Sequence, residues 1–350
     1  MRFGRTSTLH RVLLAVCLLS VGACGPAPAP SATVEFSGPT MGTTWSVKVV
    51  PPAGGLTADA AGDIATSIRD ILDRIDTLMS TWKPESELSR FNASASTEPF
   101  AVAPETWDVF EWSARIHDET GGAFDPTIGP LIDAWGFGVD RDIDPPDEAT
   151  VTRLMATTGM SLIELDPAGR WVRKLEPGVR VDFSAIAPGY AADRIADDLA
   201  RRGLGNFLVD VGGELVGRGT NERGEPWRIG IERPRQVGRE VARVVPVIDQ
   251  ALATSGDYRN FREVDGERFT HILDPRVGRP VHHTLASVTV LAGSGVRADA
   301  LATALMVLGP AEAPEFAAAH EIAALFLIRR PDGSFEEEQS PAFGPAPTVP

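Results

Sequence analysis

Two oxygen-bearing side chains stand one helical turn apart near the C-terminal end of the sequence. Asp299 and Thr303 are four positions apart within the stretch Arg297–Ala304, so on a helix their oxygens lie on one face. A carboxylate and a hydroxyl on one face form part of a site for Mg²⁺, which prefers oxygen ligands and completes its shell with waters or phosphates. The spacing alone favours a simpler role, in which Asp299 caps the N-terminus of its helix.

Two irregular loops are candidates for ligand binding. The segment Val181–Asp193 combines small residues with a helix start, where free N–H groups attract anions and a ligand can approach the backbone. Asp182 at its entry is either a ligand anchor or a turn residue. The segment Gly121–Pro130 is rich in glycine and proline, and it indicates either a ligand-lining loop or a helix C-cap that leads into a turn.

His271 precedes an Asp274-Pro275 turn, and Arg276 and Arg279 follow closely in the sequence. A neutral imidazole is suited to proton abstraction near pH 7, so His271 is a candidate general base. A lone histidine without further context is more often structural. The residues by themselves therefore leave both roles open.

Hydrophobic patterns predict strands and helices that are interleaved without a regular βαβ rhythm. We expect helices over Gly62–Met79, from Pro104 to the Gly121-Gly122 stop, over Gly189–Arg202 and over Ala298–Leu308. We expect strands within Val34–Val50, Ser161–Leu165, Trp171–Leu175, Asn206–Val216, Trp227–Glu232, Ala242–Ile248, Ala286–Leu291 and Ile322–Ile328. The sequence has neither a Gly-x-Gly-x-x-Gly strand-to-helix turn nor a Walker A motif. These patterns predict a mixed α+β fold with largely antiparallel sheets and flanking helices.

The N-terminal residues have the features of an export signal. Three arginines within the first eleven residues precede the apolar stretch Val12–Leu19, which is too short to span a bilayer. We expect residues 1–23 to be a signal peptide and Cys24 to be the lipidated first residue of the mature protein. Residues 24–33 then form a Pro/Ala tether. An ordinary secretory signal that is cut near Ala23 is the alternative.

Charge and cysteine content exclude several kinds of site. The chain has a net charge of −15, which argues against nucleic-acid binding. Cys17 and Cys24 are its only cysteines, so the mature domain has no disulfide, no thiolate metal site and no cysteine nucleophile. We expect one globular domain over 34–330 and disorder in the acidic, Pro-rich tail over 331–350.

Taken together and in this order, these motifs resemble one family, the FAD:protein FMN transferases or ApbE-type flavin transferases. The resemblance runs from about Phe36 to Ile328. Its further landmarks are Met41–Trp45, Met79–Trp82, Ser86–Asn92, Asp210–Glu214 and Ala253–Tyr258. The resemblance implies a two-lobed α+β domain with a ligand cleft.

Members of this family transfer FMN from FAD to a Thr or Ser hydroxyl of an acceptor protein through a phosphoester bond and release AMP. The resemblance implies Mg²⁺ held by the backbone carbonyl of Ala185, the carboxylate of Asp299 and the hydroxyl of Thr303, with His271 as the base. The positions that match FAD contacts are Met41, Trp82, Ala123, Phe124, Asp125, Asp182, Pro188 and Ile272. The implied acceptors are flavin-bearing subunits of membrane electron-transfer complexes. They face the same periplasmic side as a lipoprotein anchored in the bacterial cell membrane.

Pro188 departs from the family's pattern, which often has a lysine at this position. The change removes a cation near the phosphates or the flavin, and we expect Arg276 or Arg279 to compensate. Trp82 and Tyr258 are the expected faces for a flat ring. Two alternative functions stay open. One is a metal-dependent FAD pyrophosphatase that yields FMN and AMP, and the other is a lipoprotein that binds FAD without chemistry.

Overall fold

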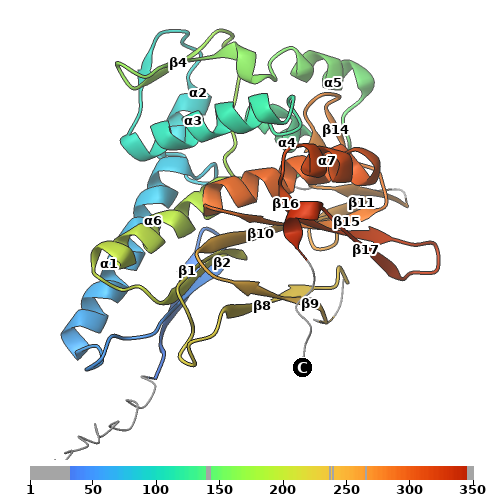
Figure 1. Ribbon diagram of the computed structural model, residues 1–350. Helices are drawn as coiled ribbons and strands as arrows, with labels where there is room; N and C mark the ends of the chain where they lie inside the picture. The colour runs from blue at the N-terminus through green and yellow to red at the C-terminus, as the bar shows by residue number, and fades with distance from the viewer. Residues whose placement is uncertain (1–31, 139–142, 236–237, 239, 265, 345–350) are drawn as a thin grey trace, which may run out of the picture. The chain divides into compact units, whose positions relative to one another are not determined.

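An eight-stranded sheet forms the centre of the domain (Figure 1). The computed structural model describes residues 32–344 apart from 139–142, 236–237, 239 and 265. The expected signal peptide, Cys24 and most of the tether lie outside the described residues. In spatial order the strands are β1 (Val34–Thr40), β2 (Thr43–Val49), β6 (Phe207–Val211), β7 (Glu214–Arg218), β10 (Gln250–Gly256), β15 (Leu285–Ala292), β16 (Ala323–Arg329) and β17 (Phe335–Gln339). Every neighbouring pair is antiparallel, which confirms the predicted α+β class.

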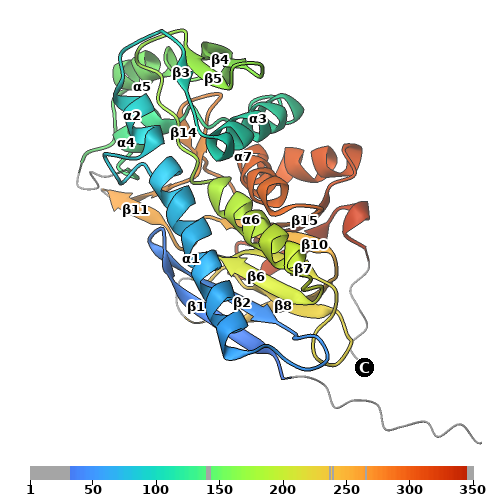
Figure 2. The same cartoon turned by 90° about the vertical axis from the view of Figure 1, so that its left-hand side faces the viewer.

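Three long helices cover one face of this sheet (Figure 2). They are α1 (Ala58–Met79), α6 (Ala187–Arg201) and α7 (Gly295–Ala319). Helix α1 begins after Thr57, whose hydroxyl accepts the N–H of Ala60. Its buried apolar residues recur every three or four positions: Ile64, Ile68, Leu72, Ile75, Leu78 and Met79. This apolar stripe belongs to the same core cluster as residues of β2 and β6.

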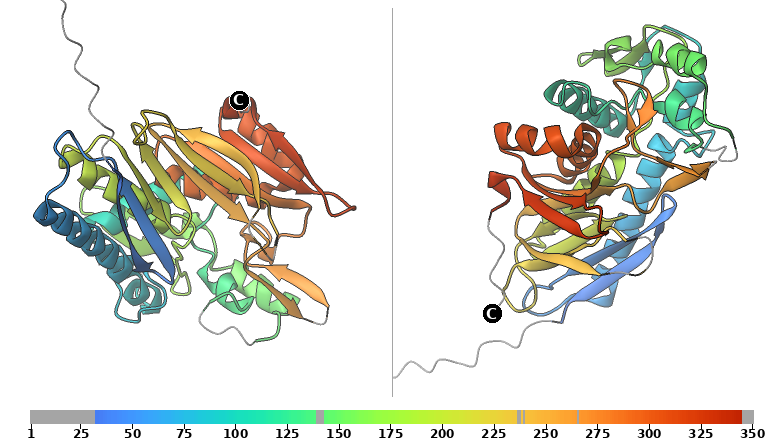
Figure 3. Two further views of the ribbon diagram at one scale, coloured as in Figure 1. Left: turned by 90° about the horizontal axis from the view of Figure 1, so that it is seen from below. Right: turned by 90° about the vertical axis from the view of Figure 1, so that its right-hand side faces the viewer.

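The opposite face of the sheet is covered by a separate hairpin (Figure 3). Its strands are β8 (Trp227–Glu232) and β9 (Val241–Val247). Trp227 belongs to an apolar cluster that also contains Leu252 and Leu325 of the sheet. Because the middle of the sheet is covered on both faces, the first six residues of β15 are all buried instead of alternating.

Shorter helices and a three-stranded sheet form the other part of the domain (Figure 1). These elements are α2 (Glu87–Ala93), α3 (Pro104–Glu119), α4 (Gly129–Ala134), α5 (Glu148–Met155), β3 (Phe100–Ala101), β4 (Ile163–Asp166) and β5 (Trp171–Lys174). Two hairpins accompany them: β11 (Phe261–Val264) with β12 (Glu267–Thr270), and β13 (Leu273–Asp274) with β14 (Arg279–Pro280). Trp135 donates from Nε1 to the carbonyl of Gly278 at 2.9 Å and so ties the segment after α4 to the second hairpin.

The C-terminal tail departs most clearly from the sequence prediction. The sequence predicts disorder over 331–350, but β17 pairs with β16 at the edge of the sheet. A short 3₁₀ turn at Pro341–Phe343 follows, and Phe343 is buried. Residues 345–350 lie outside the described part of the chain. The prediction failed because local composition does not report pairing with a distant strand.

Two further differences concern strands. The segment 34–50 forms the hairpin of β1 and β2 instead of a single strand, and the turn between them places Met41 at a φ of 41°. Strand β10, which carries Thr254 and Ser255, was not predicted as a strand. Its mixture of alanine, threonine and serine has no strong strand signal.

A kink divides α7 at Gly309, whose φ of 75° and ψ of −176° are not helical. Pro310 follows and has no N–H, so the carbonyl of Met306 loses its partner within the helix. His283 replaces that partner, with its Nε2 atom 2.8 Å from the Met306 carbonyl oxygen. Since a carbonyl oxygen only accepts, Nε2 carries the hydrogen.

We expect His283→Ala to lower the free energy of unfolding by about 1–3 kcal/mol, because the buried Met306 carbonyl would lack a donor. Burial lowers the pKa of His283. The unfolded chain therefore binds this proton more readily, and the wild-type protein loses stability as the pH falls below about 6.5. Urea unfolding above and below this pH measures both effects. Exposed His282→Ala is the control, and equal losses in the two variants would contradict the role of His283.

Candidate active site

One cavity brings together most of the side chains that the sequence singled out. It has a volume of about 340 Å³, and we call it the site cavity. The predicted residues in its lining are Ala123, Phe124, Asp125, Asp182, Ala185, His271, Ile272, Asp299 and Thr303. They come from the loop after α3, the turn before α6, the segment before β13 and helix α7. The cavity therefore lies where the two parts of the domain meet.

The position of Asp299 depends on a close contact between the starts of α6 and α7. A Cβ atom at Gly189 would lie 2.3 Å from the carbonyl oxygen of Gly295, so only glycine allows this approach. Asp299 Oδ2 accepts the N–H of Gly189 at 3.0 Å. In the other direction, Asp193 of α6 accepts the N–H groups of Gly295 at 2.6 Å and of Val296 at 2.9 Å. Each helix thus receives a carboxylate from the other.

This exchange decides the role of Asp299 that spacing had left open. The carboxylate that caps α7 is Asp193, so the capping role predicted for Asp299 in its own helix is wrong. Asp299 Oδ1 has no hydrogen-bond partner among the described residues. Gly189 is the third residue of α6, so its N–H has no acceptor within the helix and donates to Asp299. Ala185 lies before the first residue of α6 and lines the site cavity, so its backbone carbonyl is a candidate ligand.

The lining of the site cavity includes the acids Asp299 and Glu214 and the hydroxyl residues Thr303 and Ser255. Burial raises the pKa of Asp299, and burial together with the charge of Asp299 raises the pKa of Glu214 well above its usual range. Thr303 Oγ1 lies 3.1 Å from Ser255 Oγ. Within the described ranges, no three His, Cys, Asp or Glu side chains form a metal-binding group. Carboxylate and hydroxyl oxygens are the ligands that Mg²⁺ prefers, with water or phosphate oxygens completing its shell, so the donors here are compatible with that metal.

His271 is held in one orientation by the backbone of Asn260. Its Nδ1 atom lies 2.9 Å from the Asn260 carbonyl oxygen, which also accepts the N–H of His271 at 3.2 Å. Since the carbonyl only accepts, Nδ1 carries the hydrogen and Nε2 keeps a lone pair. Burial lowers the pKa of His271, so the ring is neutral near pH 7. This geometry suits a general base.

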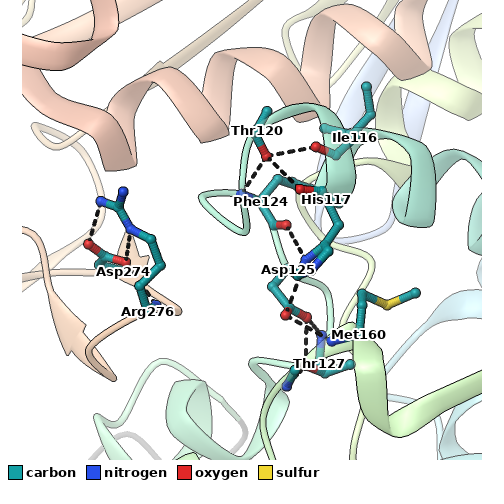
Figure 4. Close-up of polar contacts among 10 residues, drawn as sticks. Ile116, His117, Thr120, Phe124, Asp125, Thr127, Met160, Asp274 and Arg276 are labelled. Atoms are coloured by element: carbon teal, nitrogen blue, oxygen red, sulfur yellow. Dashed lines mark hydrogen bonds and ion pairs between the residues drawn. The ribbon is translucent and has the colours of Figure 1, made fainter. Parts of the chain in front are cut away.

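Asp125 is tied into the fold by its own carboxylate (Figure 4). Asp125 Oδ1 accepts the N–H of Thr127 at 2.8 Å and its hydroxyl at 2.5 Å. Asp125 Oδ2 accepts the N–H of Met160 at 3.1 Å and lies 3.3 Å from His117 Nδ1, which raises the pKa of His117. Because these bonds occupy both carboxylate oxygens, we expect Asp125 to position the loop and to meet a ligand mainly through its backbone.

Asp182 is a turn residue that also faces the site cavity. Its Oδ1 atom accepts the N–H of Ser184 at 2.7 Å, and its own N–H donates to the carbonyl of Pro126 at 2.7 Å. Burial raises the pKa of Asp182, against the opposing effect of its bonds with Ser184. The position of Asp182 is therefore compatible with both roles that the sequence left open, the turn residue and the ligand anchor.

Three predicted FAD contacts lie outside the site cavity. Met41, Trp82 and Pro188 line a neighbouring cavity of about 620 Å³, which we call the Met41 cavity. Lys83 lines the same cavity, and its Nζ atom forms an ion pair with Asp76 at 2.5 Å. A cation, Lys83, is therefore present in the cavity that Pro188 lines, where the resemblance leads us to expect a lysine.

Arg276 and Arg279 do not take over the role of that lysine, contrary to the sequence prediction. Neither lines the site cavity or the Met41 cavity. Arg276 forms an ion pair with Asp274 at 2.8 Å (Figure 4), and Arg279 pairs with Glu148. Their proximity to His271 in the sequence misled the prediction, because the β13–β14 turn directs both side chains elsewhere.

A third cavity of about 670 Å³ adjoins the other two, and we call it the outer cavity. Arg180, Trp82 and His271 are among its lining residues. It shares His271 with the site cavity and Trp82 with the Met41 cavity. Ser184 lines all three, so the cavities meet around the turn before α6. Together they offer room for a ligand with two ring systems and a connecting diphosphate.

We expect Gly189→Ala to lower the free energy of unfolding by about 1–3 kcal/mol and to weaken metal binding. The added Cβ atom would meet a backbone carbonyl at 2.3 Å, and a backbone atom cannot rotate away. Thermal unfolding with and without Mg²⁺ measures both effects. Gly62→Ala in α1 is the matched control, because a Cβ atom there meets nothing within 4 Å. A Gly189→Ala protein as stable as this control would contradict the close contact.

Comparison with known proteins places this chain in a family. Residues 41–326 match the model of the ApbE family. A FAD:protein FMN transferase of Vibrio cholerae is 42% identical over 336 residues, which cover 95% of this chain and 97% of the relative. One from Escherichia coli K12 is 38% identical over 339 residues, covering 95% of each chain.

Solved structures of flavin transferases also resemble this chain. The flavin transferase ApbE from Vibrio cholerae has a TM-score of 0.81 at 39% identity, covering 91% of this chain and all of that one (100%). The apo form of the Pseudomonas stutzeri flavinyl transferase ApbE has a TM-score of 0.81 at 36% identity, with coverage of 89% and 96%. A family match over most of the chain, together with relatives of this identity, establishes membership: the chain belongs to the ApbE family.

Proposed function

We propose that this protein is a metal-dependent flavin transferase that moves FMN from FAD to a Thr or Ser hydroxyl of an acceptor protein and releases AMP. The observation that carries the proposal is the site cavity, in which His271, Asp299 and Thr303 line one space. The names and folds of the related proteins support the same reaction.

The residues of the site cavity have two roles: one accepts a proton, and the others hold the metal that neutralises negative charge. The acceptor hydroxyl gives its proton to His271 Nε2, its oxygen bonds to the FMN-side phosphorus, and the P–O bond to AMP breaks. The Ala185 carbonyl, Asp299 and Thr303 would hold Mg²⁺, which when bound neutralises charge on the diphosphate. Pairing of His271 Nδ1 with the Asn260 carbonyl keeps Nε2 ready to accept the proton.

FAD is the proposed donor, and the arrangement of the site cavity and the Met41 cavity supports a stretched dinucleotide. The diphosphate would lie beside Asp299 in the site cavity, and one ring system would lie in the Met41 cavity against Met41 and Trp82. The other ring would use the far end of the site cavity, where Tyr258 and Ile272 form part of the lining.

One incubation separates this proposal from its two alternatives. The purified protein is mixed with FAD, Mg²⁺ and a library of short peptides that each carry one central threonine. Peptides heavier by FMN, together with an equal amount of AMP, support transfer. Free FMN and AMP without modified peptide would indicate FAD hydrolysis. Bound but intact FAD would indicate a protein that only binds flavin.

We further propose that the protein is a lipoprotein at the periplasmic face of the bacterial cell membrane. Its acceptors are then flavin-bearing subunits of membrane electron-transfer complexes in the same compartment. The supporting features are the arginines, the short apolar stretch and Cys24 in the N-terminal sequence. In the part of the chain that the structure describes, no helix is long and apolar enough to cross a membrane.

We expect Cys24→Ser to move the protein from the membrane fraction to the soluble fraction. A thioether-linked lipid needs the sulfur atom of this residue, and without it the anchor is lost. Cell fractionation and the mass of the N-terminal peptide measure the result. Cys17→Ser is the control, because Cys17 lies within the apolar stretch before the cleavage point. Membrane retention of both the wild type and Cys24→Ser, with neither form lipidated, would rule out the lipid anchor.

A further inference from the structure

The outer cavity is the only one of the three that the proposed positions of FAD and metal leave unassigned. Ala185, Asp299 and Thr303 line the site cavity and neither of the other two, so a diphosphate held by the metal belongs there. The Met41 cavity has the apolar lining that a flat ring requires, including Met41 and Phe183. The outer cavity shares Trp82 with the Met41 cavity and Asp182 with the site cavity, and a dinucleotide that fills those two spaces leaves the rest of the outer cavity open.

The outer cavity has a polar wall that opens to solvent. Arg180 and Asp133 form an ion pair across 2.6 Å, and their side chains remain 45% and 38% exposed. Asn260 and Ser184 also line it. A polypeptide needs hydrogen-bonding partners for its backbone amides and must enter from outside, and this cavity offers both.

The inner end of the outer cavity reaches the proposed base. His271 lines both the outer cavity and the site cavity, as does Asp182. Since the nucleophile must contact His271 Nε2 and a phosphorus atom at the same time, it has to arrive where these cavities join. A hydroxyl that enters through the outer cavity meets this requirement without displacing the dinucleotide.

The wall of the outer cavity is held in place before any ligand arrives. Asn92 donates from Nδ2 to the Val181 carbonyl at 2.7 Å and accepts the N–H of Val181 on Oδ1 at 2.8 Å. Buried Lys174 donates to the carbonyls of Asn92 at 3.2 Å and Ser94 at 2.9 Å, which fixes the end of α2. A preformed wall lowers the ordering cost of binding a flexible segment.

We propose that the outer cavity is the groove that receives the acceptor polypeptide, with its Ser or Thr hydroxyl directed at His271. The assignment rests on the proposed transferase function. The acceptor hydroxyl loses its proton to His271 Nε2, its oxygen bonds to the FMN phosphorus and AMP leaves, so the groove determines which polypeptides are modified. Residues that line only the outer cavity then determine acceptor selectivity, and residues of the site cavity and the Met41 cavity determine FAD affinity.

Ala134→Trp tests this separation. Ala134, the last residue of α4, lines the outer cavity and neither of the others. The probe is the library peptide that the wild-type protein modifies fastest. We expect the KM for this peptide to rise by about tenfold or more, while the FAD dissociation constant stays within about twofold. Ala168→Trp is the matched control, because Ala168 is exposed in the β4–β5 turn and lines none of the three cavities.

A second measurement applies if the tryptophan variant does not fold. Ala134→Cys adds a small thiol, and its labelling by a maleimide is followed by mass spectrometry at position 134. We expect the peptide to slow labelling at this position and FAD alone to leave it unchanged. Protection by FAD alone, or weaker FAD binding with an unchanged peptide KM in Ala134→Trp, would overturn the assignment. Absence of peptide modification by the wild-type protein would instead refute the transferase function itself.

Discussion

Asp299→Asn is expected to abolish metal-dependent FMN transfer while the domain stays folded. The amide oxygen can still accept the N–H of Gly189, which Asp299 now accepts at 3.0 Å, so the contact between α6 and α7 is preserved. The negative charge at the metal position is lost. Since partners outside the first coordination shell are already worth about 10–100-fold in metal affinity, we expect a loss of more than about a hundredfold here.

Stability gives a readout of this change that is independent of activity. Mg²⁺ that binds only the folded state raises the midpoint of thermal unfolding of the wild-type protein, and we expect no such rise for Asp299→Asn. Burial raises the pKa of Asp299, so its carboxylate opposes folding when no cation is bound. The metal-free variant should therefore be at least as stable as the metal-free wild type at neutral pH.

Glu315→Gln is the matched control for Asp299→Asn. It removes one carboxylate from the same helix, but Glu315 is exposed and lines none of the three cavities. We expect its Mg²⁺-induced stabilisation and its transfer rate to equal those of the wild type. If Mg²⁺ raised the unfolding midpoint of Asp299→Asn as much as that of the control, Asp299 and its helix α7 would not belong to the metal site.

His271→Ala is expected to slow single-turnover FMN transfer by about 10²–10⁴-fold. FAD affinity should change much less, because the proposed base acts on the acceptor hydroxyl and not on the bound dinucleotide. Flavin fluorescence measures FAD affinity, and rapid quenching measures the transfer step. His282→Ala, an exposed histidine eleven positions along the chain, is the control that tests for unspecific effects.

The pH dependence of transfer gives a second test of His271. Burial lowers the pKa of His271, so the ring loses its proton at a lower pH than an exposed histidine does. The transfer rate should fall on the acid side only below about pH 6.5, and this limb should disappear in His271→Ala. Equal losses of FAD affinity and rate in the variant would mean that His271 shapes the pocket and does not accept the proton.

Local sequence patterns were sufficient for many of the helices and strands. The apolar spacing of α1, the start of α3 at Pro104 and the strands β4 and β5 all follow from patterns within a few residues. The same holds for the helix that places Asp299 and Thr303 four residues apart. Such features are readable because their period and their end signals depend on nearby residues only.

Long-range contacts decided what the local patterns left open. Spacing alone favoured Asp299 as a helix cap, but the cap is Asp193, 102 positions from Gly295, whose N–H it accepts. Glu214 was missed as a cavity residue because it follows the Gly212-Gly213 turn, and nothing in its spacing relates it to α7. The ordered tail was missed because β17 is stabilised by β16 and not by its own composition.

The sequence by itself thus determined the residue types for oxygen-ligand and imidazole chemistry and the helices and strands on which they stand. Tertiary structure alone decided which oxygens are used up by the fold and which remain for a ligand. The physical reason is that a carboxylate near a helix start accepts a hydrogen bond from any unpaired backbone N–H close to it, whether that N–H is in its own helix or in another. Here the contact between Gly189 and Gly295 puts the N–H groups of each helix within reach of the other helix's carboxylate.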